Sequence, residues 1–185
     1  YNSATRTLSF AGQLPGVIPA AMTIISDTAG LPAGYISLAS LNVPPSPCDE
    51  ICDDYGVTYI APAFTYNGVS YDRVTITTNG YLIVGAATTK KAIFNQRLPN
   101  PIEPNNVVAP YWTDLDLLGS APGDVGGGTW YAALVTFRGD PRTWFVAEWA
   151  DAARYGRISA DSHHSFQIWI EGGSDQFHLA YGPNS

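Results

Sequence analysis

Residues 74–85 read VTITTNGYLIVG, two runs of β-branched and aromatic residues on either side of Asn79-Gly80. Both turn residues tolerate a positive φ, which a two-residue type I′ turn requires, so this stretch predicts a β-hairpin. Counting outward from the turn predicts four facing pairs: Thr78 with Tyr81, Thr77 with Leu82, Ile76 with Ile83, and Thr75 with Val84. The face that carries Ile76 and Ile83 is apolar, so a second layer must cover it.

The rest of the chain repeats this pattern of short alternating strands separated by turns rich in Gly and Pro. Besides the hairpin we expect strands at Thr5–Phe10, Ala21–Ser26, Tyr35–Leu41, Thr58–Ile60, Ala63–Tyr66, Val107–Trp112, Thr129–Phe137, Thr143–Trp149, Ser165–Ile170 and Phe177–Tyr181. The turns at 138–141 and 172–175 have hairpin length and predict antiparallel neighbours. With little or no helical periodicity, these strands predict an all-β fold, a jelly-roll-like antiparallel β-sandwich.

The length of 185 residues predicts a single sandwich domain. Residues 1–45 would form N-terminal strands or an arm that joins the main sheets, because so short a segment rarely sustains its own core, and residues 46–185 would form the main body. The proline-rich run NVPPSP at 42–47 is typical of a linker. Residues 86–106 predict a long ordered excursion over the surface.

Composition excludes several classes of function. A content of 45% hydrophobic and 14% charged residues is typical of a globular chain. The net charge of −7 and the single adjacent basic pair, Lys90-Lys91, argue against binding to nucleic acid. No apolar run approaches the roughly 20 residues that a membrane span needs. The chain opens on Tyr1 without a signal-peptide pattern and is interpreted as a piece of a longer protein.

Two cysteines, Cys48 and Cys52, lie four positions apart in PSPCDEICDDYG. In an acidic, turn-rich chain this spacing favours a local disulfide that closes a loop. The alternative is a zinc site, which would need two further ligands. The available histidines, His163, His164 and His178, lie far along the chain, so we favour the disulfide.

No catalytic signature appears in the sequence, which lacks GxSxG, HExxH, a P-loop and a well-placed GxGxxG. Asp161, Ser162, His163 and His164 include the residue types of a catalytic triad. Adjacency in sequence is not triad geometry, however, and DSHH is more typical of a solvated turn. We therefore expect no catalytic residues and no enzymatic activity from this chain.

Acidic clusters are the better candidates for a site. Asp114 and Asp116 in WTDLDLLGS would point to the same side of an extended strand, and Asp124 follows in a Gly-rich loop. Three carboxylates with loop carbonyls are a ligand set for calcium, the one cofactor we consider. A second cluster contains Asp49, Glu50, Asp53 and Asp54. The alternative for both clusters is turn capping and solubility.

Five tryptophans could pack the core or stack on sugar rings: Trp112, Trp130, Trp144, Trp149 and Trp169. Trp169 alternates away from Phe166, Ile168 and Ile170, so it should face outward from the core between the sheets. It is the candidate ligand-binding residue, and the alternative is that a loop covers it.

Several runs resemble a domain found toward the C-terminus of secreted bacterial subtilisin-like serine proteases. The similar segments extend from Phe64 to Gly182: FTYNGVSYDRVTITTNGYLIVG, FNQRLPNPIEPNNVVAPYWTDLDL, GGGTWYAAL, TWFVAEWADAARYG and HSFQIWIEGGSDQFHLAYG. TRTLSFAGQLP is similar to the linker expected after such a protease domain. The segments TNGYLIVG and NNVVAPYWTDLD also resemble nidogen-like extracellular domains.

The resemblance implies a secreted, non-catalytic accessory domain of a subtilisin-like protease that binds substrate or a surface, or stabilises the parent enzyme. Its partners would be the catalytic domain of that protease and a protein or polysaccharide surface. It carries over no catalytic residue, because the Asp, His and Ser motifs of those proteases are absent here. The alternative is a carbohydrate-binding or nidogen-like adhesion module. A free hydrolase, which only Asp161, His163 and His164 suggest, is the weakest hypothesis.

Overall fold

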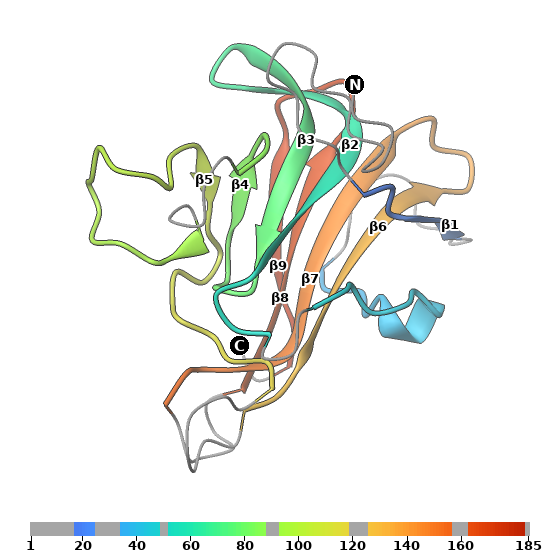
Figure 1. The fold of residues 1–185 in the computed structure, drawn as a ribbon. Helices are drawn as coiled ribbons and strands as arrows, with labels where there is room; N and C mark the ends of the chain where they lie inside the picture. The colour runs from blue at the N-terminus through green and yellow to red at the C-terminus, as the bar shows by residue number, and fades with distance from the viewer. Residues whose placement is uncertain are drawn as a thin grey trace, which may run out of the picture.

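The computed structural model describes residues 17–24, 34–48, 52–87, 93–118, 126–156 and 163–183. Two β-sheets pack face to face (Figure 1). One sheet has the order β2-β3-β4-β5, formed by β2 (Gly56–Tyr66), β3 (Val69–Thr77), β4 (Leu82–Val84) and β5 (Val107–Val108). The other has the order β1-β6-β7-β8-β9, formed by β1 (Ala20–Ile24), β6 (Thr129–Phe137), β7 (Thr143–Ala153), β8 (His163–Glu171) and β9 (Phe177–Tyr181). The predicted all-β sandwich is confirmed.

Most strand predictions hold, and their exceptions have local causes. β6 and β9 have the predicted bounds, and both predicted hairpins, β6–β7 and β8–β9, pair antiparallel. The two strands expected at 58–60 and 63–66 are one strand, β2, with a register shift between Ile60 and Phe64 around Pro62. The strand expected at 107–112 is only β5, because Pro110 cannot donate to a sheet ladder. Thr5–Phe10 lies outside the described residues.

The hairpin at Asn79-Gly80 exists, but its predicted register was wrong by one residue. Ile76 faces Leu82 rather than Ile83, and the Thr77 N–H donates to the Tyr81 carbonyl at 3.1 Å. The connection is therefore a three-residue loop in which Gly80, at φ +75°, takes the left-handed conformation, while Asn79 does not. A shift of one residue exchanges the two faces, so Val74, Ile76, Leu82 and Val84 face the core between the sheets.

The core between the sheets contains apolar side chains from both layers. β2, β3 and β4 contribute residues such as Tyr59 and Ile76, and β6, β7 and β8 contribute residues such as Trp130 and Trp149. The Trp149 indole N–H crosses the gap and donates to the Thr77 carbonyl at 2.9 Å. The apolar face of the hairpin is thus covered by a second sheet, as its sequence predicts.

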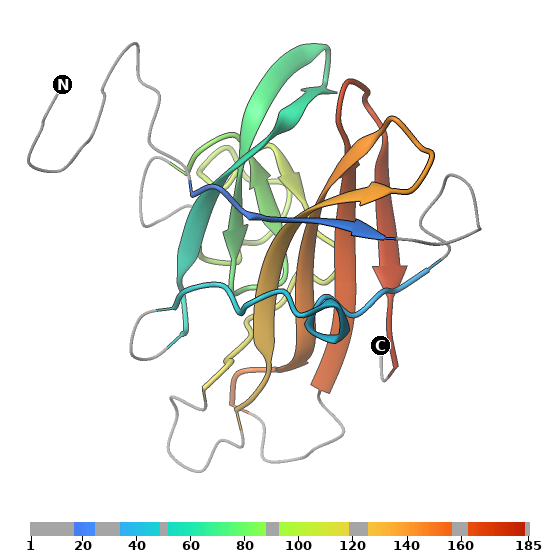
Figure 2. The same cartoon turned by 90° about the vertical axis from the view of Figure 1, so that its right-hand side faces the viewer.

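A second core lies on the outer face of the five-stranded sheet, where residues 34–43 cross the strands (Figure 2). This segment is not the strand predicted at Tyr35–Leu41, because its backbone bonds to side chains instead of to another strand. Gln167 accepts from the Ile36 N–H and donates to its carbonyl, and Glu148 accepts from the Leu38 N–H at 2.8 Å. The segment ends in the short 3-10 helix η1 (Ala39–Leu41).

Trp169 faces outward from the core between the sheets, as predicted, yet it is 0% exposed. It packs in this outer core with Leu38, Phe137 and Trp144, and its indole N–H donates to Gln167. The prediction that Trp169 binds a ligand at the surface is therefore wrong, because residues 34–43 cover it. Packing, the alternative, is what the structure shows for this tryptophan.

The N-terminal part of the chain contributes to both sheets. β1 lies parallel to β6, and Val17 bridges Tyr59 of β2. The run 42–47 is not a free linker, because Val43 is buried and the Ser46 N–H donates to the Trp130 carbonyl at 2.9 Å. The division of the chain into one domain stays a prediction. Among the described residues, no helix is long and apolar enough to cross a membrane.

Candidate functional site

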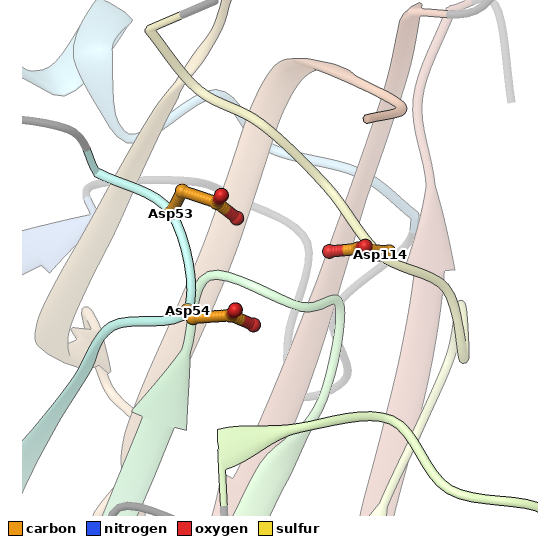
Figure 3. A group of neighbouring side chains, drawn as sticks. All are labelled: Asp53, Asp54 and Asp114. Carbon is orange, nitrogen blue, oxygen red and sulfur yellow. The ribbon is translucent and has the colours of Figure 1, made fainter. Parts of the chain in front are cut away.

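Three aspartates converge at one end of the sandwich (Figure 3). Asp53 and Asp54 precede β2, and Asp114 belongs to the irregular segment that follows β5. One carboxylate oxygen from each of the three lies within 4.8 Å of the others. We call Asp53, Asp54 and Asp114 the acidic cluster. Asp114 comes from the acidic run at 114–124, and Asp53 and Asp54 come from the acidic run at 49–54, so the cluster joins the two runs that the sequence suggested as calcium ligands.

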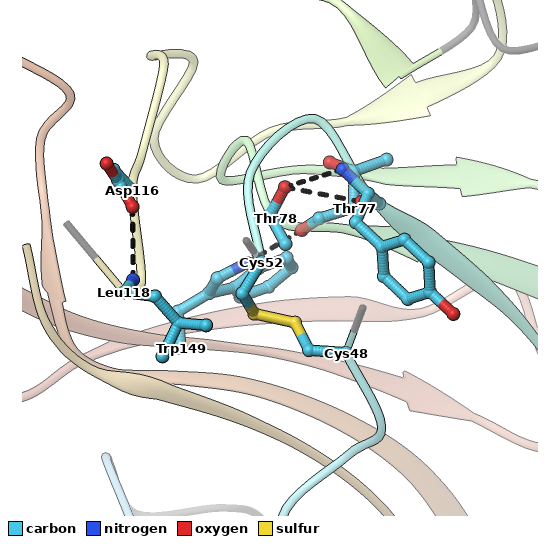
Figure 4. Close-up of a disulfide and its surroundings, with 8 residues drawn as sticks. Cys48, Cys52, Thr77, Thr78, Asp116, Leu118 and Trp149 are labelled. Atoms are coloured by element: carbon cyan, nitrogen blue, oxygen red, sulfur yellow. Dashed lines mark hydrogen bonds between the residues drawn. A yellow bond between two sulfur atoms is a disulfide. The ribbon is translucent and has the colours of Figure 1, made fainter. Parts of the chain in front are cut away.

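The loop that supplies Asp53 and Asp54 is held by the predicted disulfide between Cys48 and Cys52, which is confirmed (Figure 4). Both cysteines are oxidised, so the alternative of a zinc site at this pair is wrong. Cys52 and Asp54 adopt positive φ values of 49° and 46°. The chain therefore turns sharply here and places two successive carboxylates beside the sandwich.

The segment that supplies Asp114 is anchored differently from the predicted strand. The Tyr155 N–H donates to the Asp114 carbonyl at 3.0 Å, which ties the segment to the end of β7. Asp116 does not share a surface with Asp114: it is buried, and its carboxylate accepts from the Leu118 N–H at 3.0 Å (Figure 4). The expectation that both side chains leave one side of a strand was wrong, because this segment consists of bends with an isolated bridge at Leu115 rather than a regular strand.

Three members of the predicted acidic runs cannot be placed. Asp124 of the first run, and Asp49 and Glu50 of the second, lie outside the described residues. Their predicted part in a metal site stays a prediction.

Asn79 joins the two segments of the acidic cluster, a role that sequence reasoning missed. Its amide donates to Asp54 Oδ1 and to the Ile93 carbonyl, both at 2.8 Å, and its Oδ1 accepts from the Leu115 N–H at 3.2 Å. The side chain is only 1% exposed. The sequence identifies Asn79 only as a turn residue, and an asparagine in a turn need not contact any other segment. The hairpin turn therefore positions Asp54 and, through Leu115, the segment that contains Asp114.

Negative charge accumulates in the acidic cluster. Asp114 is exposed at the surface, yet desolvation by the surrounding chain, followed by the charges of Asp53, Asp54 and Asp116, raises the pKa of its carboxyl to about 6. A raised carboxyl pKa means that the folded chain holds this proton more tightly than the unfolded chain does. Each of these causes raises the pKa, and a nearby cation would lower it.

The donor atoms of the cluster match a hard divalent cation. All three side chains offer carboxylate oxygens, which calcium prefers, and calcium tolerates flexible coordination by six to eight oxygens. Carboxylates that bind in a bidentate manner, together with main-chain oxygens or water, can reach that number. The arrangement therefore fits calcium better than zinc, which favours nitrogen and sulfur ligands.

The raised pKa of Asp114 predicts a pH dependence of stability. Between pH 3.8 and about 6 the unfolded chain loses this proton while the folded chain keeps it, so the free energy of unfolding should fall as pH rises through that window. We expect Asp114→Asn to remove this component, measured by urea unfolding in EDTA at several pH values. Asp175→Asn, at an exposed turn, is the matched control and should keep the wild-type profile. Identical profiles for Asp114→Asn and wild type would contradict the assignment.

The histidines do not form the predicted turn. His163 and His164 are the first two residues of β8, so their side chains leave opposite faces of the sheet. His163 Nδ1 lies 3.3 Å from Asp151 Oδ2, and His164 Nε2 lies 3.0 Å from the Tyr111 hydroxyl. Asp161 and Ser162 lie outside the described residues. The hypothesis of a triad in DSHH gains no support from this arrangement.

The region of the chain that matches a known family includes all three residues of the acidic cluster. Residues 47–185 match the model of the family described as NIDO related. The chain belongs to the NIDO-related family. This match supports the predicted likeness to nidogen-like domains. No curated protein and no solved structure matches the chain. The family match begins after residues 34–43, which cover the outer core, and includes both sheets except β1.

Proposed function

We propose that this chain is an extracellular, non-catalytic interaction module of the NIDO-related family whose acidic cluster binds a calcium ion. The observation that carries the calcium assignment is the convergence of Asp53, Asp54 and Asp114 within 4.8 Å, with the pKa of Asp114 raised. The family and the disulfide support the extracellular setting. Calcium at extracellular concentrations could fill a site of modest affinity.

Calcium in this position would connect two segments that are distant in sequence. Residues 52–54 are tied back to Cys48 by the disulfide, and Asp114 is tied through Tyr155 to the turn that follows β7. Binding would neutralise mutual repulsion among the carboxylates and fix one end of the sandwich. The function of the ion in this proposal is to hold a binding surface rigid, and it takes no part in a reaction.

The expected result of adding calcium is a more stable fold. With a dissociation constant of about 10 μM, 1 mM calcium should stabilise the protein by roughly 2.7 kcal/mol, which raises the melting temperature by several degrees. EDTA should reverse the shift, and Asp114→Asn should remove most of it, whereas Asp175→Asn should keep it. The shift should also be smaller at pH 5 than at pH 7.5, because protons compete at Asp114. Superimposable melting curves in calcium and EDTA would contradict the proposal.

The accessory role beside a subtilisin-like protease stays a prediction, because neither the structure nor the family match supports it. The sequence upstream of Tyr1 would test it, since a subtilisin-like protease domain there would contain its own GTSMA-like Ser motif. Hydrolysis of casein by the purified chain, if a serine-protease inhibitor blocked it, would contradict the non-catalytic assignment. The buried position of Trp169 removes the main observation in favour of polysaccharide binding.

A further inference from the structure

The outer edge of β9 is the feature that the proposed function leaves unexplained. β9 (Phe177–Tyr181) is the last strand of the five-stranded sheet, and β8 is its one partner among the described residues. A free edge offers a row of backbone donors and acceptors to another strand.

The register identifies the backbone groups that point away from β8. The Gly182 N–H donates to the Ser165 carbonyl at 2.8 Å, and the Glu171 N–H donates to the Gln176 carbonyl at 3.1 Å. Hydrogen-bonded positions alternate along an antiparallel pair, so positions 176, 178, 180 and 182 face β8. The N–H and C=O groups of Phe177, Leu179 and Tyr181 therefore point outward.

The side chains of Leu179 and Tyr181 leave apolar surface beside this edge, whereas Phe177 packs against Phe64 and Tyr66 in the core between the sheets, and the Tyr181 hydroxyl donates to the Pro110 carbonyl at 3.2 Å. Leu179 is 46% exposed and Tyr181 is 53% exposed, although both belong to a strand. The strand FHLAY contains no Asp, Glu, Lys, Arg or Pro, in a chain of net charge −7. Natural proteins usually protect free edges with charges, prolines or bulges.

The edge of the other sheet shows such protection. β2 contains Pro62 within a register shift, and Val17 already bridges its outer side. β5, at the opposite edge of that sheet, has only two residues. β9 has no charge, proline or register shift, and the same holds for β1 (AAMTI) at the other edge of its sheet, so what favours a partner at β9 is its exposed Leu179 and Tyr181.

We propose that β9 pairs with β9 of a second copy of this chain, antiparallel and about a twofold axis at Leu179. In this arrangement Leu179 faces Leu179 of the second copy, and Phe177 faces Tyr181 of the second copy. Each facing pair exchanges two backbone hydrogen bonds, because the outward groups belong to these three positions. The two five-stranded sheets then become one continuous sheet.

The sequence of β9 favours a second copy over an unrelated peptide. The three positions whose backbone groups point outward read aromatic, leucine, aromatic, a pattern that is unchanged when the strand is reversed. Antiparallel self-pairing therefore gives an apolar contact at every position, and aromatic pairs across strands add to the stability of the interface. Any peptide could satisfy the backbone, but the symmetry of the side chains is specific to a twofold dimer.

Sedimentation velocity of the full chain in EDTA tests this proposal independently of calcium. We expect a concentration-dependent dimer in the wild type. Leu179→Lys, which places two lysines opposite each other at the axis, should weaken dimerisation about tenfold or more. Val69→Lys, at a residue 53% exposed on β3, is the matched control and should dimerise like the wild type. Melting curves of both variants check that they are folded.

Amide hydrogen exchange locates the interface. The amides of Phe177, Leu179 and Tyr181 should gain protection as the protein concentration rises, and those of His178 and Ala180 should be protected at every concentration. A chain that stays monomeric at all concentrations would overturn the proposal. So would a dimer that Leu179→Lys leaves unchanged, or one in which these three amides gain no protection.

Discussion

Replacing Gly80 with alanine is expected to lower the free energy of unfolding by at least about 3 kcal/mol. Gly80 has φ +75°, and a Cβ at this position would lie 2.0 Å from the Tyr111 carbonyl oxygen. That carbonyl belongs to backbone, so the clash cannot be relieved by a side-chain rotation. The left-handed conformation and the overlap both oppose any larger residue.

Gly139→Ala is the matched control for this substitution. Gly139 has φ +82° at the turn between β6 and β7, but a Cβ there would meet nothing within 4 Å. Gly139→Ala should lower the free energy of unfolding by only about 1 kcal/mol, because only the left-handed backbone conformation opposes the added Cβ. The difference between the two urea midpoints measures the close approach of residues 80 and 111. Equal midpoints for the two variants would show that the approach is absent in solution.

Asn79→Ala should have the second largest effect, a loss of about 3 kcal/mol. The substitution removes the donors to Asp54 and to the Ile93 carbonyl, and it leaves the buried Leu115 N–H without its acceptor. Each buried polar group left unsatisfied costs about 1–3 kcal/mol. Thermal and urea unfolding in EDTA measure the loss directly.

The control for Asn79→Ala is Asn105→Ala, because Asn105 is exposed and makes one long hydrogen bond of 3.5 Å to Pro101. It should change stability by no more than about 0.5 kcal/mol. Asn79→Ala should also weaken any calcium response, since it releases Asp54. An Asn79→Ala protein as stable as Asn105→Ala would contradict the role of Asn79 as the residue that joins the two segments.

The hairpin shows how far local sequence predicts structure. Asn79-Gly80 between β-rich runs predicts the turn, and the structure has one. The same dipeptide can occupy a two-residue or a three-residue loop, and the choice changes the register by one residue. In the structure the Tyr111 N–H donates to the Gly80 carbonyl at 3.4 Å, and Asn79 is engaged with Leu115. These contacts come from a segment far along the chain, which local pattern cannot include.

The acidic cluster shows a similar limit. Sequence reasoning found both acidic runs but grouped residues by their spacing along the chain, so Asp114 was paired with Asp116. The fold instead brings Asp114 to Asp53 and Asp54 and buries Asp116. Spacing predicts a shared face only where the segment is a regular strand, and residues 111–118 are bends with an isolated bridge at Leu115.

Glu148 is a buried acidic residue whose place in the sequence indicates a covering segment. It is the one acidic residue at the centre of WFVAEWA, a run that is otherwise buried and apolar. A buried carboxylate is costly without hydrogen bonds, and Glu148 accepts hydrogen bonds from the Tyr35 hydroxyl and the Leu38 N–H. Burial raises the pKa of Glu148, and these hydrogen bonds oppose that rise. A lone acid in a buried strand therefore predicts a covering segment, although not which one.

Calorimetric titration of the full chain with calcium at pH 7.5 tests the central claim most directly. The account predicts saturable binding of about one ion with micromolar affinity. It also predicts that Asp114→Asn and Asp54→Asn each weaken binding about tenfold or more, and that Asp175→Asn binds as the wild type does. No heat of binding in the wild type, or binding that Asp114→Asn leaves unchanged, would contradict the assignment of the acidic cluster as a calcium site.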